Sequence, residues 1–269
     1  MNPTKRSPFG RIPLFFFITY FFLLIPFFSF SQKQTLKQIE LDLLKASNKL
    51  FSFYQPHESD SLFKYSELLR NKTIEILGKN PGTLKYPFQI LIDSTAFEIV
   101  TSEDSLFRIY TWDSWTGGTM HFYEIIYQFR NKGRVYTEPV MLEEGDGGAF
   151  YSEIFTLKTG TKTYYLAVSN ATFSTKDAAQ SIEVFSIENN NLNKQVKLIK
   201  TAEGMTNRIG FEFDFFSVVD RPERPLKLIK YDNNKKIIYV PVVYEDGKVT
   251  DKFIQYKFNG KYFEKYKIK

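Results

Sequence analysis

The sequence predicts a mainly β protein, an antiparallel meander that forms a barrel, a sandwich or propeller-like blades and follows a short N-terminal αα-hairpin. Three observations favour this class. Aromatic residues make up 17% of the 269 residues, and flat side chains pack well on a pleated sheet. From residue 88 onward, apolar residues recur in short alternating runs, as in strands with one buried face. Turn residues separate these runs at short intervals, which is typical of consecutive hairpins.

Residues 1–31 are typical of an export signal. The segment begins with bases and has no acid, and its bases are Lys5, Arg6 and Arg11. Residues 14–25 then form an apolar run. Small residues at 29 and 31 have the spacing that a signal peptidase reads, so we expect cleavage before Gln32. An uncleaved membrane anchor is the alternative, although the uninterrupted run is shorter than the roughly 20 residues that a membrane span needs.

The composition limits the possible chemistry. The chain has no cysteine, which excludes a cysteine nucleophile, a thiolate zinc site and an iron–sulfur cluster. The formal charge of +6 falls to +3 once the three leader bases are removed, because no acid leaves with them. The basic isoelectric point is therefore weak evidence for nucleic-acid binding, and we expect no nucleic-acid partner. With two histidines and no phosphate-binding motif, we also expect no metal and no cofactor.

Residues 32–80 are predicted to form the helical hairpin. Apolar residues recur at steps of three and four in two stretches, the spacing that gives a helix one buried side. The first stretch contains Leu36, Ile39, Leu43, Ala46, Leu50 and Phe53, and the second contains Leu62, Tyr65, Leu69 and Ile76. Pro56 separates them, because proline ends a helix. These stripes require burial against each other or against the remaining chain.

Residues 81–269 are predicted to form the antiparallel β domain. Candidate strands span residues 88–92, 96–101, 106–112, 119–129, 150–157, 162–168, 182–187, 196–200, 209–218, 226–230, 237–244, 248–258 and 262–268. Asp246-Gly247 and Asn259-Gly260 are strong signals for two-residue turns in which both central residues take a positive φ.

The stretch from Arg108 to Ile125 contains both tryptophans and predicts a hairpin with Ser114–Gly118 as its loop. The resulting register pairs Phe107 with Ile125, Ile109 with Tyr123, Thr111 with His121 and Asp113 with Thr119. This register forms an apolar row on one face, and such cross-strand pairs contribute about 0.2–1 kcal/mol each. Gly117 and Gly118 are expected to supply permissive backbone angles at the end of the loop.

The same hairpin contains the candidate binding residues Tyr110, Trp112, Asp113, Trp115 and His121. In the predicted register His121 lies one rung from Asp113 on the same face, and a carboxylate beside a histidine orients it and raises its basicity. Trp115 at the loop tip is placed to stack on a sugar ring or an aromatic partner. A catalytic pair also needs a nucleophile, and no G-x-S-x-G elbow occurs. A structural hairpin end and a binding rim remain alternatives.

The acids between Asp113 and Asp146 give a further alternative, an exported glycoside hydrolase. They are Asp113, Glu124, Glu143, Glu144 and Asp146. Such an enzyme needs two carboxylates about 5–10 Å apart across an open cleft. Residues 143–148, EEGDGG, match no calcium-loop spacing and are interpreted as a solvated loop.

The leader that ends in FSFSQ and the run FRIYTWDSWTGGTMHFYEIIYQF resemble uncharacterised exported proteins of Bacteroidota. The resemblance implies an exported protein without an assigned activity and transfers no site residues. Since the chain is rich in aromatics and lacks a catalytic signature, we expect a non-enzymatic domain in the periplasm or at the cell surface. We expect it to bind a glycan or an envelope protein, and to meet the membrane only through its N-terminal segment if that segment is not cleaved.

Overall fold

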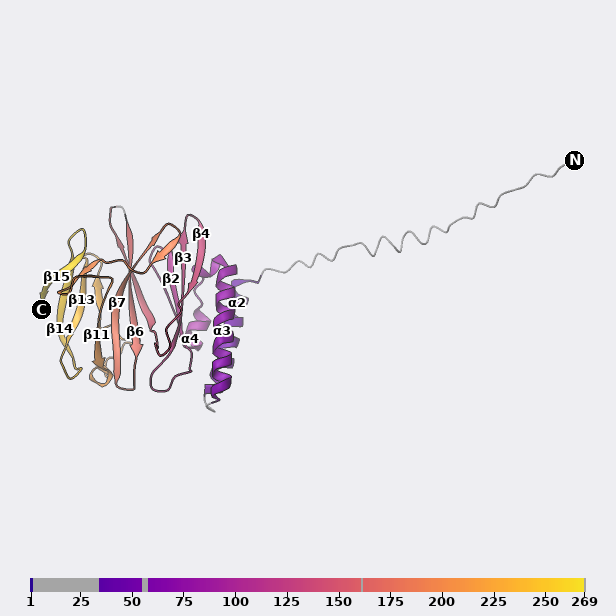
Figure 1. The fold of residues 1–269 in the computed structure, drawn as a ribbon, viewed down its shortest axis with the longest axis horizontal. Coiled ribbons are helices and arrows are strands. Elements are labelled where there is room, and N and C mark those ends of the chain that lie inside the picture. The colour runs from indigo at the N-terminus through magenta and orange to yellow at the C-terminus, as the bar shows by residue number, and fades with distance from the viewer. Residues whose placement is uncertain (2–33, 55–57, 161, 269) are drawn as a thin grey trace. The chain divides into compact units, whose positions relative to one another are not determined.

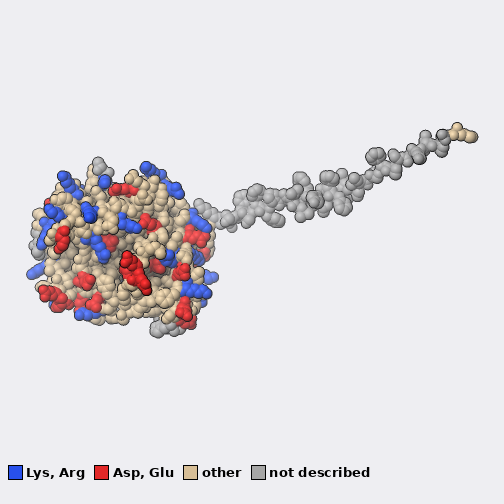
Figure 2. Space-filling model, viewed as in Figure 1, with Lys and Arg blue, Asp and Glu red and all other residues tan. Residues whose placement is uncertain are grey.

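The computed structural model describes residues 1, 34–54, 58–160 and 162–268. The predicted leader and its cleavage site lie outside these described residues, apart from Met1. Among the described helices, none combines the length and the apolar character needed to cross a membrane. On the face shown in Figure 2, basic and acidic side chains are interspersed.

Two helices precede the strands and confirm the predicted helical pair. Helix α2 spans Leu36–Tyr54 and helix α3 spans Ser59–Lys79. Their buried stripes, which include Ile39, Leu43 and Leu69, pack together with the side chains of Phe97, Tyr110 and Trp112. The helices therefore share one core with the first strands, and the chain from Thr35 onward forms one compact unit.

The predicted strand at residues 88–92 is wrong, because this segment is helix α4 (Gln89–Ser94), which follows the 3-10 helix η2 (Pro81–Leu84). A short apolar run fits a strand and a buried helix equally well. The buried Glu40 of α2 favours the helix here. Its Oε1 accepts hydrogen bonds from the N–H groups of Ile90 (2.8 Å) and Leu91 (3.2 Å), which satisfies free donors at the helix start.

The described residues form three sheets. The first sheet contains, in spatial order, β1 (Phe97–Thr101), β2 (Phe107–Asp113), β3 (Tyr123–Asn131) and β4 (Arg134–Pro139). The second has the order β11 (Arg208–Asp214), β7 (Asp177–Glu188), β6 (Thr163–Thr172) and β5 (Phe150–Lys158), with β8 (Asn191–Asn193) paired to β7. The third has the order β10 (Met205–Thr206), β9 (Ile199–Lys200), β15 (Phe263–Ile268), β14 (Val249–Phe258), β13 (Ile237–Val243) and β12 (Lys230–Asp232). All pairs are antiparallel except β15 with β9, so the mainly antiparallel fold class is confirmed.

Side-chain alternation stacks these sheets face to face. In the second sheet, Tyr165 and Phe185 pack against the first sheet, in the core of Phe107, Ile109 and Tyr127. Their neighbours Leu166 and Val184 point the other way, into a core shared with the third sheet. Because alternate strand residues face opposite sides, the middle sheet is apolar on both faces. Figure 1 shows the resulting order, with the helices beside the first sheet and the C-terminal strands farthest from them.

Most other predicted strands occur with shifted ends. The predicted strand at 119–129 begins only at Tyr123, residues 215–218 form the 3-10 helix η3, and the segment 226–230 contributes only Lys230 to a strand. Strands β4, β8 and β10 were not predicted, because they are short or lack clear alternation. In the two hairpin turns only Gly247 and Gly260 have a positive φ, so the expected two-residue turns are wrong and wider turns occur there.

Candidate functional site

The hairpin of β2 and β3 exists, but its predicted register is wrong. Ile109 pairs with Tyr127 and Asp113 pairs with Tyr123. Each partner in β3 therefore lies four residues further toward the C-terminus than predicted. The loop is therefore residues 114–122. Because four is an even number, each side chain keeps its predicted face of the sheet. The longer loop has anchors of its own, since Ser114 N–H bonds the Phe122 carbonyl (2.8 Å) and His121 N–H bonds the Thr172 carbonyl of β6 (3.1 Å).

Asp113 and His121 are brought together as expected. Asp113 is 7% exposed, and its Oδ2 lies 2.5 Å from Nδ1 of His121. Its Oδ1 accepts the N–H of Trp115 at 2.8 Å. The hydrogen bond that the Asp113 carboxylate accepts raises the pKa of His121, and burial of the ring partly opposes this shift. The second ring nitrogen, Nε2, makes no hydrogen bond with the described residues, and the side chain is 38% exposed.

Trp115 lies at the tip of the loop in a left-handed conformation, with φ of 59°. This region is costly for a bulky residue, so the surrounding structure must hold it there. Two contacts do so besides the bond to Asp113. The indole ring packs against Tyr54 at 4.7 Å and Phe51 at 5.2 Å between ring centroids. The loop tip is thus seated against the end of α2 and leaves the indole half-buried.

Tyr110 and Trp112 do not belong to a binding rim, which corrects the expectation for these two residues. Each is 1% exposed. Trp112 stacks on Phe97 at 4.6 Å, and the Tyr110 hydroxyl donates to the Thr83 carbonyl and to Gln128 Oε1. Both side chains fill the core between the helices and the first sheet, because their strand positions face α2 and α3. Of the five candidates, Asp113, Trp115 and His121 remain at the loop.

Two adjoining cavities lie along the loop, and together we name them the loop groove. The first has a volume of about 480 Å³ and the second about 470 Å³. The first is lined by residues that include Phe63, Glu67, Arg70, Thr116, Phe122, Glu124, Met141 and Asp146. The second is lined by residues that include Tyr54, Ser59, Phe63, Trp115, Thr116 and Gly118. Phe63 borders both cavities and is 61% exposed, so the groove presents aromatic surface to solvent.

The first cavity contains an ion pair among its charged lining residues. Arg70 Nε lies 2.9 Å from Glu124 Oε2, with side chains 19% and 22% exposed. Burial raises the pKa of Glu124, and the guanidinium of Arg70 opposes part of that shift. The sequence interpretation missed Phe63 and Arg70. Phe63, Glu67 and Arg70 are spaced by four and three residues along α3, so they form a second stripe beside the buried one. This spacing is the signal in the sequence that could have revealed Phe63 and Arg70.

The acids proposed for a hydrolase do not gather in one place. Glu124 and Asp146 line the first cavity, whereas Asp113 is engaged with Trp115 and His121. Asp146 Oδ1 accepts the N–H of Gly148 at 2.8 Å, so it also shapes its own turn. No group of three or more histidine and acidic residues within the described chain is placed to hold a metal ion.

The glycine-rich segment EEGDGG, residues 143–148, packs against the end of the loop. A Cβ on Gly147 would lie 2.6 Å from the His121 carbonyl oxygen and 2.9 Å from Met120. The Gly147 carbonyl accepts the N–H of Tyr123 at 2.8 Å. Glycine is needed here because two backbones approach closely. Residues 143–146 are exposed, as expected of a solvated loop, and Gly147 is buried and packs against the candidate site.

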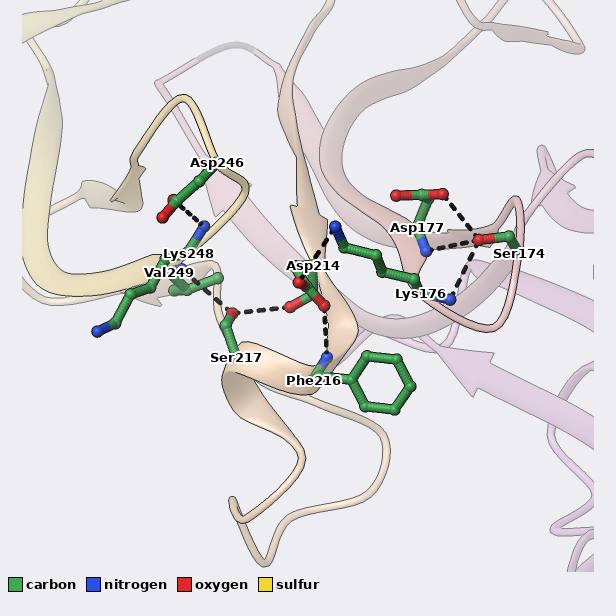
Figure 3. A network of polar contacts seen from close by, with 9 residues as sticks. All are labelled: Ser174, Lys176, Asp177, Asp214, Phe216, Ser217, Asp246, Lys248 and Val249. Atoms are coloured by element: carbon green, nitrogen blue, oxygen red, sulfur yellow. Dashed lines mark hydrogen bonds and ion pairs between the residues drawn. The ribbon is translucent and has the colours of Figure 1, made fainter.

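A second polar cluster joins the second and third sheets and is structural (Figure 3). Asp214 Oδ1 accepts the N–H of Phe216 at 2.9 Å, which caps η3. Ser217 Oγ donates to the Asp214 carbonyl at 2.7 Å and accepts the Val249 N–H at 3.2 Å. Lys176 lies 3.6 Å from Asp214. Each of these contacts closes a turn or links two turns, so the cluster explains how the sheets are tied together.

No protein-family model matches the chain, and no curated protein shows significant similarity to it.

Proposed function

We propose that this chain is an exported, non-enzymatic binding domain that recognises a glycan through the loop groove. The observation that carries the proposal is the aromatic surface of Phe63, which is 61% exposed. Phe63 lines one cavity together with Trp115 and the other together with the Arg70–Glu124 pair. Ligand sites combine apolar and aromatic walls with a few placed polar groups. A sugar offers both partners, since its ring faces pack on aromatics and its hydroxyl groups bond charged side chains.

A glycan array probed with purified residues 32–269 tests this proposal, followed by titration of each bound glycan. Phe63→Ala is expected to weaken binding about tenfold or more, roughly 1.4 kcal/mol. Phe216→Ala is the matched control, because Phe216 is similarly exposed at 56% but lies on η3. The proposal would be contradicted if no glycan on the array binds and no partner is found in an envelope pull-down. If an envelope protein is captured and its binding depends on Phe63, the loop groove is still the binding site but its ligand is a protein and not a glycan.

Export is a separate part of the proposal and is supported by the leader described above. Fractionation of the producing cells, followed by N-terminal sequencing, tests it. We expect the envelope or secreted fraction to contain a chain that begins at Gln32. An intact N-terminus in the membrane fraction would favour the anchor, and an intact soluble chain in the cytoplasm would contradict export.

A glycoside hydrolase is the second candidate function, favoured by one observation. Glu124 and Asp146 line the same cavity, burial raises the pKa of Glu124 against the opposing effect of Arg70, and glycosidases act through a pair of carboxyl groups. Release of reducing sugar from each bound glycan distinguishes the candidates. Turnover by the wild type that is lost in Glu124→Gln with binding retained would favour the enzyme, whereas binding without turnover favours the binding domain.

A further inference from the structure

A third cavity lies away from the loop groove, at the end of β3. Its volume is about 420 Å³, and its walls come from the ends of β3, β6 and β7. Arg130 and Asn131 close β3, Lys162 and Thr163 lie at the start of β6, and Glu188 and Asn189 lie at the end of β7. None of these residues lines the loop groove, so the inference is independent of the proposed function.

Arg130 is unusual in this cavity because its charge is not compensated. Its Nε atom is buried and has no hydrogen-bond partner, and its side chain makes no ion pair with the described residues. Two other arginines contrast with this. Arg108 donates to the carbonyls of Thr83 (2.6 Å) and Tyr86 (2.5 Å), and Arg70 pairs with Glu124. Arg130 as a whole is half-buried, but a buried N–H group without an acceptor is costly, and an anion bound to the guanidinium would supply that acceptor.

The carboxylate in the cavity wall is already engaged elsewhere. Glu188 accepts the Ser186 hydroxyl at 2.8 Å and lies 3.5 Å from Lys162. The bond from Ser186, and then the charge of Lys162, lower the pKa of Glu188. Glu188 thus compensates the charge of Lys162, and the positive charge of Arg130 in the cavity wall has no carboxylate partner among the described residues.

Asn131, which is half-buried, and Asn189, which is exposed, also line the cavity, and their side-chain amides make no hydrogen bond with the described residues. An amide offers a donor and an acceptor, which suits a hydroxyl group. The planar guanidinium fork matches the geometry of a carboxylate. The volume is at the small end of the range for ligand sites, which is about 300–1,000 Å³.

We propose that this cavity binds a hydroxylated organic acid of monosaccharide size, with its carboxylate on Arg130 and its hydroxyl groups on Asn131 and Asn189. A hexuronic acid has this chemistry. Neutral sugars lack the group that Arg130 selects, and small inorganic anions lack the hydroxyl groups.

Calorimetric titration of purified residues 32–269 with glucuronate and galacturonate tests the site, with glucose and inorganic sulfate as comparison ligands. We expect at least one uronate to bind, glucose to give no heat, and sulfate to bind at least tenfold more weakly. Arg130→Met is expected to weaken uronate binding at least tenfold. Arg134→Met is the matched control, because Arg134 is exposed at the start of β4, and it should bind as the wild type does.

The melting temperature of Arg130→Met should equal or exceed that of the wild type, because no internal partner of Arg130 is lost. Asn189→Gly provides a second variant, since glycine tolerates the positive φ of 50° at this position, and it should also weaken uronate binding. Absence of uronate binding, equal binding by Arg130→Met, or sulfate binding as tight as uronate would each overturn the proposal.

Discussion

Asp113 is predicted to hold the loop of residues 114–122 in place, and Asp113→Ala tests this role. The carboxylate is 7% exposed and makes two bonds, to the Trp115 N–H at 2.8 Å and to His121 Nδ1 at 2.5 Å. A hydrogen bond to a charged group contributes about 1.5–3 kcal/mol net. The bond to His121 belongs at the low end, because the His121 side chain is 38% exposed. Together they give a loss of about 3–4.5 kcal/mol in the free energy of unfolding.

Urea denaturation measures this loss, and acrylamide quenching of tryptophan fluorescence localises it. Without Asp113, the left-handed conformation of Trp115 loses its backbone anchor, so its indole should become more accessible to the quencher. Trp112 is buried in the core and should not change, and a Trp115→Phe variant separates the two signals. Asp113→Asn keeps an acceptor for the Trp115 N–H and should lose about half as much stability as Asp113→Ala. An Asp113→Ala protein within about 0.5 kcal/mol of the wild type, with unchanged quenching, would refute this role.

Three further predictions concern the loop and the helices. Gly117→Ala should destabilise the protein by about 1–3 kcal/mol, because its Cβ would lie 2.0 Å from the Met120 carbonyl oxygen. Gly118→Ala is the control, since a Cβ there has nothing within 4 Å and the stability should stay within about 0.5 kcal/mol of the wild type. Urea denaturation of both variants measures the difference. Glu40→Ala should cost about 2–5 kcal/mol by the same assay, since the part-buried N–H of Ile90 and the buried N–H of Leu91 lose their acceptor at the start of α4. Glu40→Gln should cost less than half of that, and equal losses would contradict the capping role. The raised pKa of His121 means that its stabilising bond to Asp113 is complete below the unfolded pKa of 6.5 and is lost as pH rises through the folded pKa. The melting-temperature advantage of the wild type over His121→Gln should therefore be larger at about pH 6 than at about pH 9, and a constant advantage would contradict it.

Local periodicity was sufficient to predict the fold class, and the hairpin pattern placed Asp113, Trp115 and His121 at or beside one loop. The steps of three and four in α2 and α3 and the alternation in β6 and β7 follow directly from burial, so these elements were predictable. The contact between Asp113 and His121 was also predicted, although the register was wrong. An even shift preserves the face of each side chain, and the loop folds His121 back towards the end of β2.

Other features depend on contacts between distant segments, which one sequence does not display. Residues 89–94 are helical because Glu40 reaches them from α2. Trp112 is buried because α2 and α3 cover that face of the first sheet. Gly117 was expected to supply a backbone angle, but it has no positive φ and is needed for space beside Met120. The partners in these cases are far apart in the chain or hidden by the loop conformation.

The most direct test follows the two indole N–H signals in a proton–nitrogen NMR spectrum during titration with a glycan identified on the array. If the loop groove is the site, the Trp115 indole signal and the amide signals of Thr116 and Phe122 should shift with the added ligand, and the signal of the buried Trp112 should stay in place. Shifts confined to residues outside the groove, with Trp115 and Thr116 unchanged, would contradict the central claim.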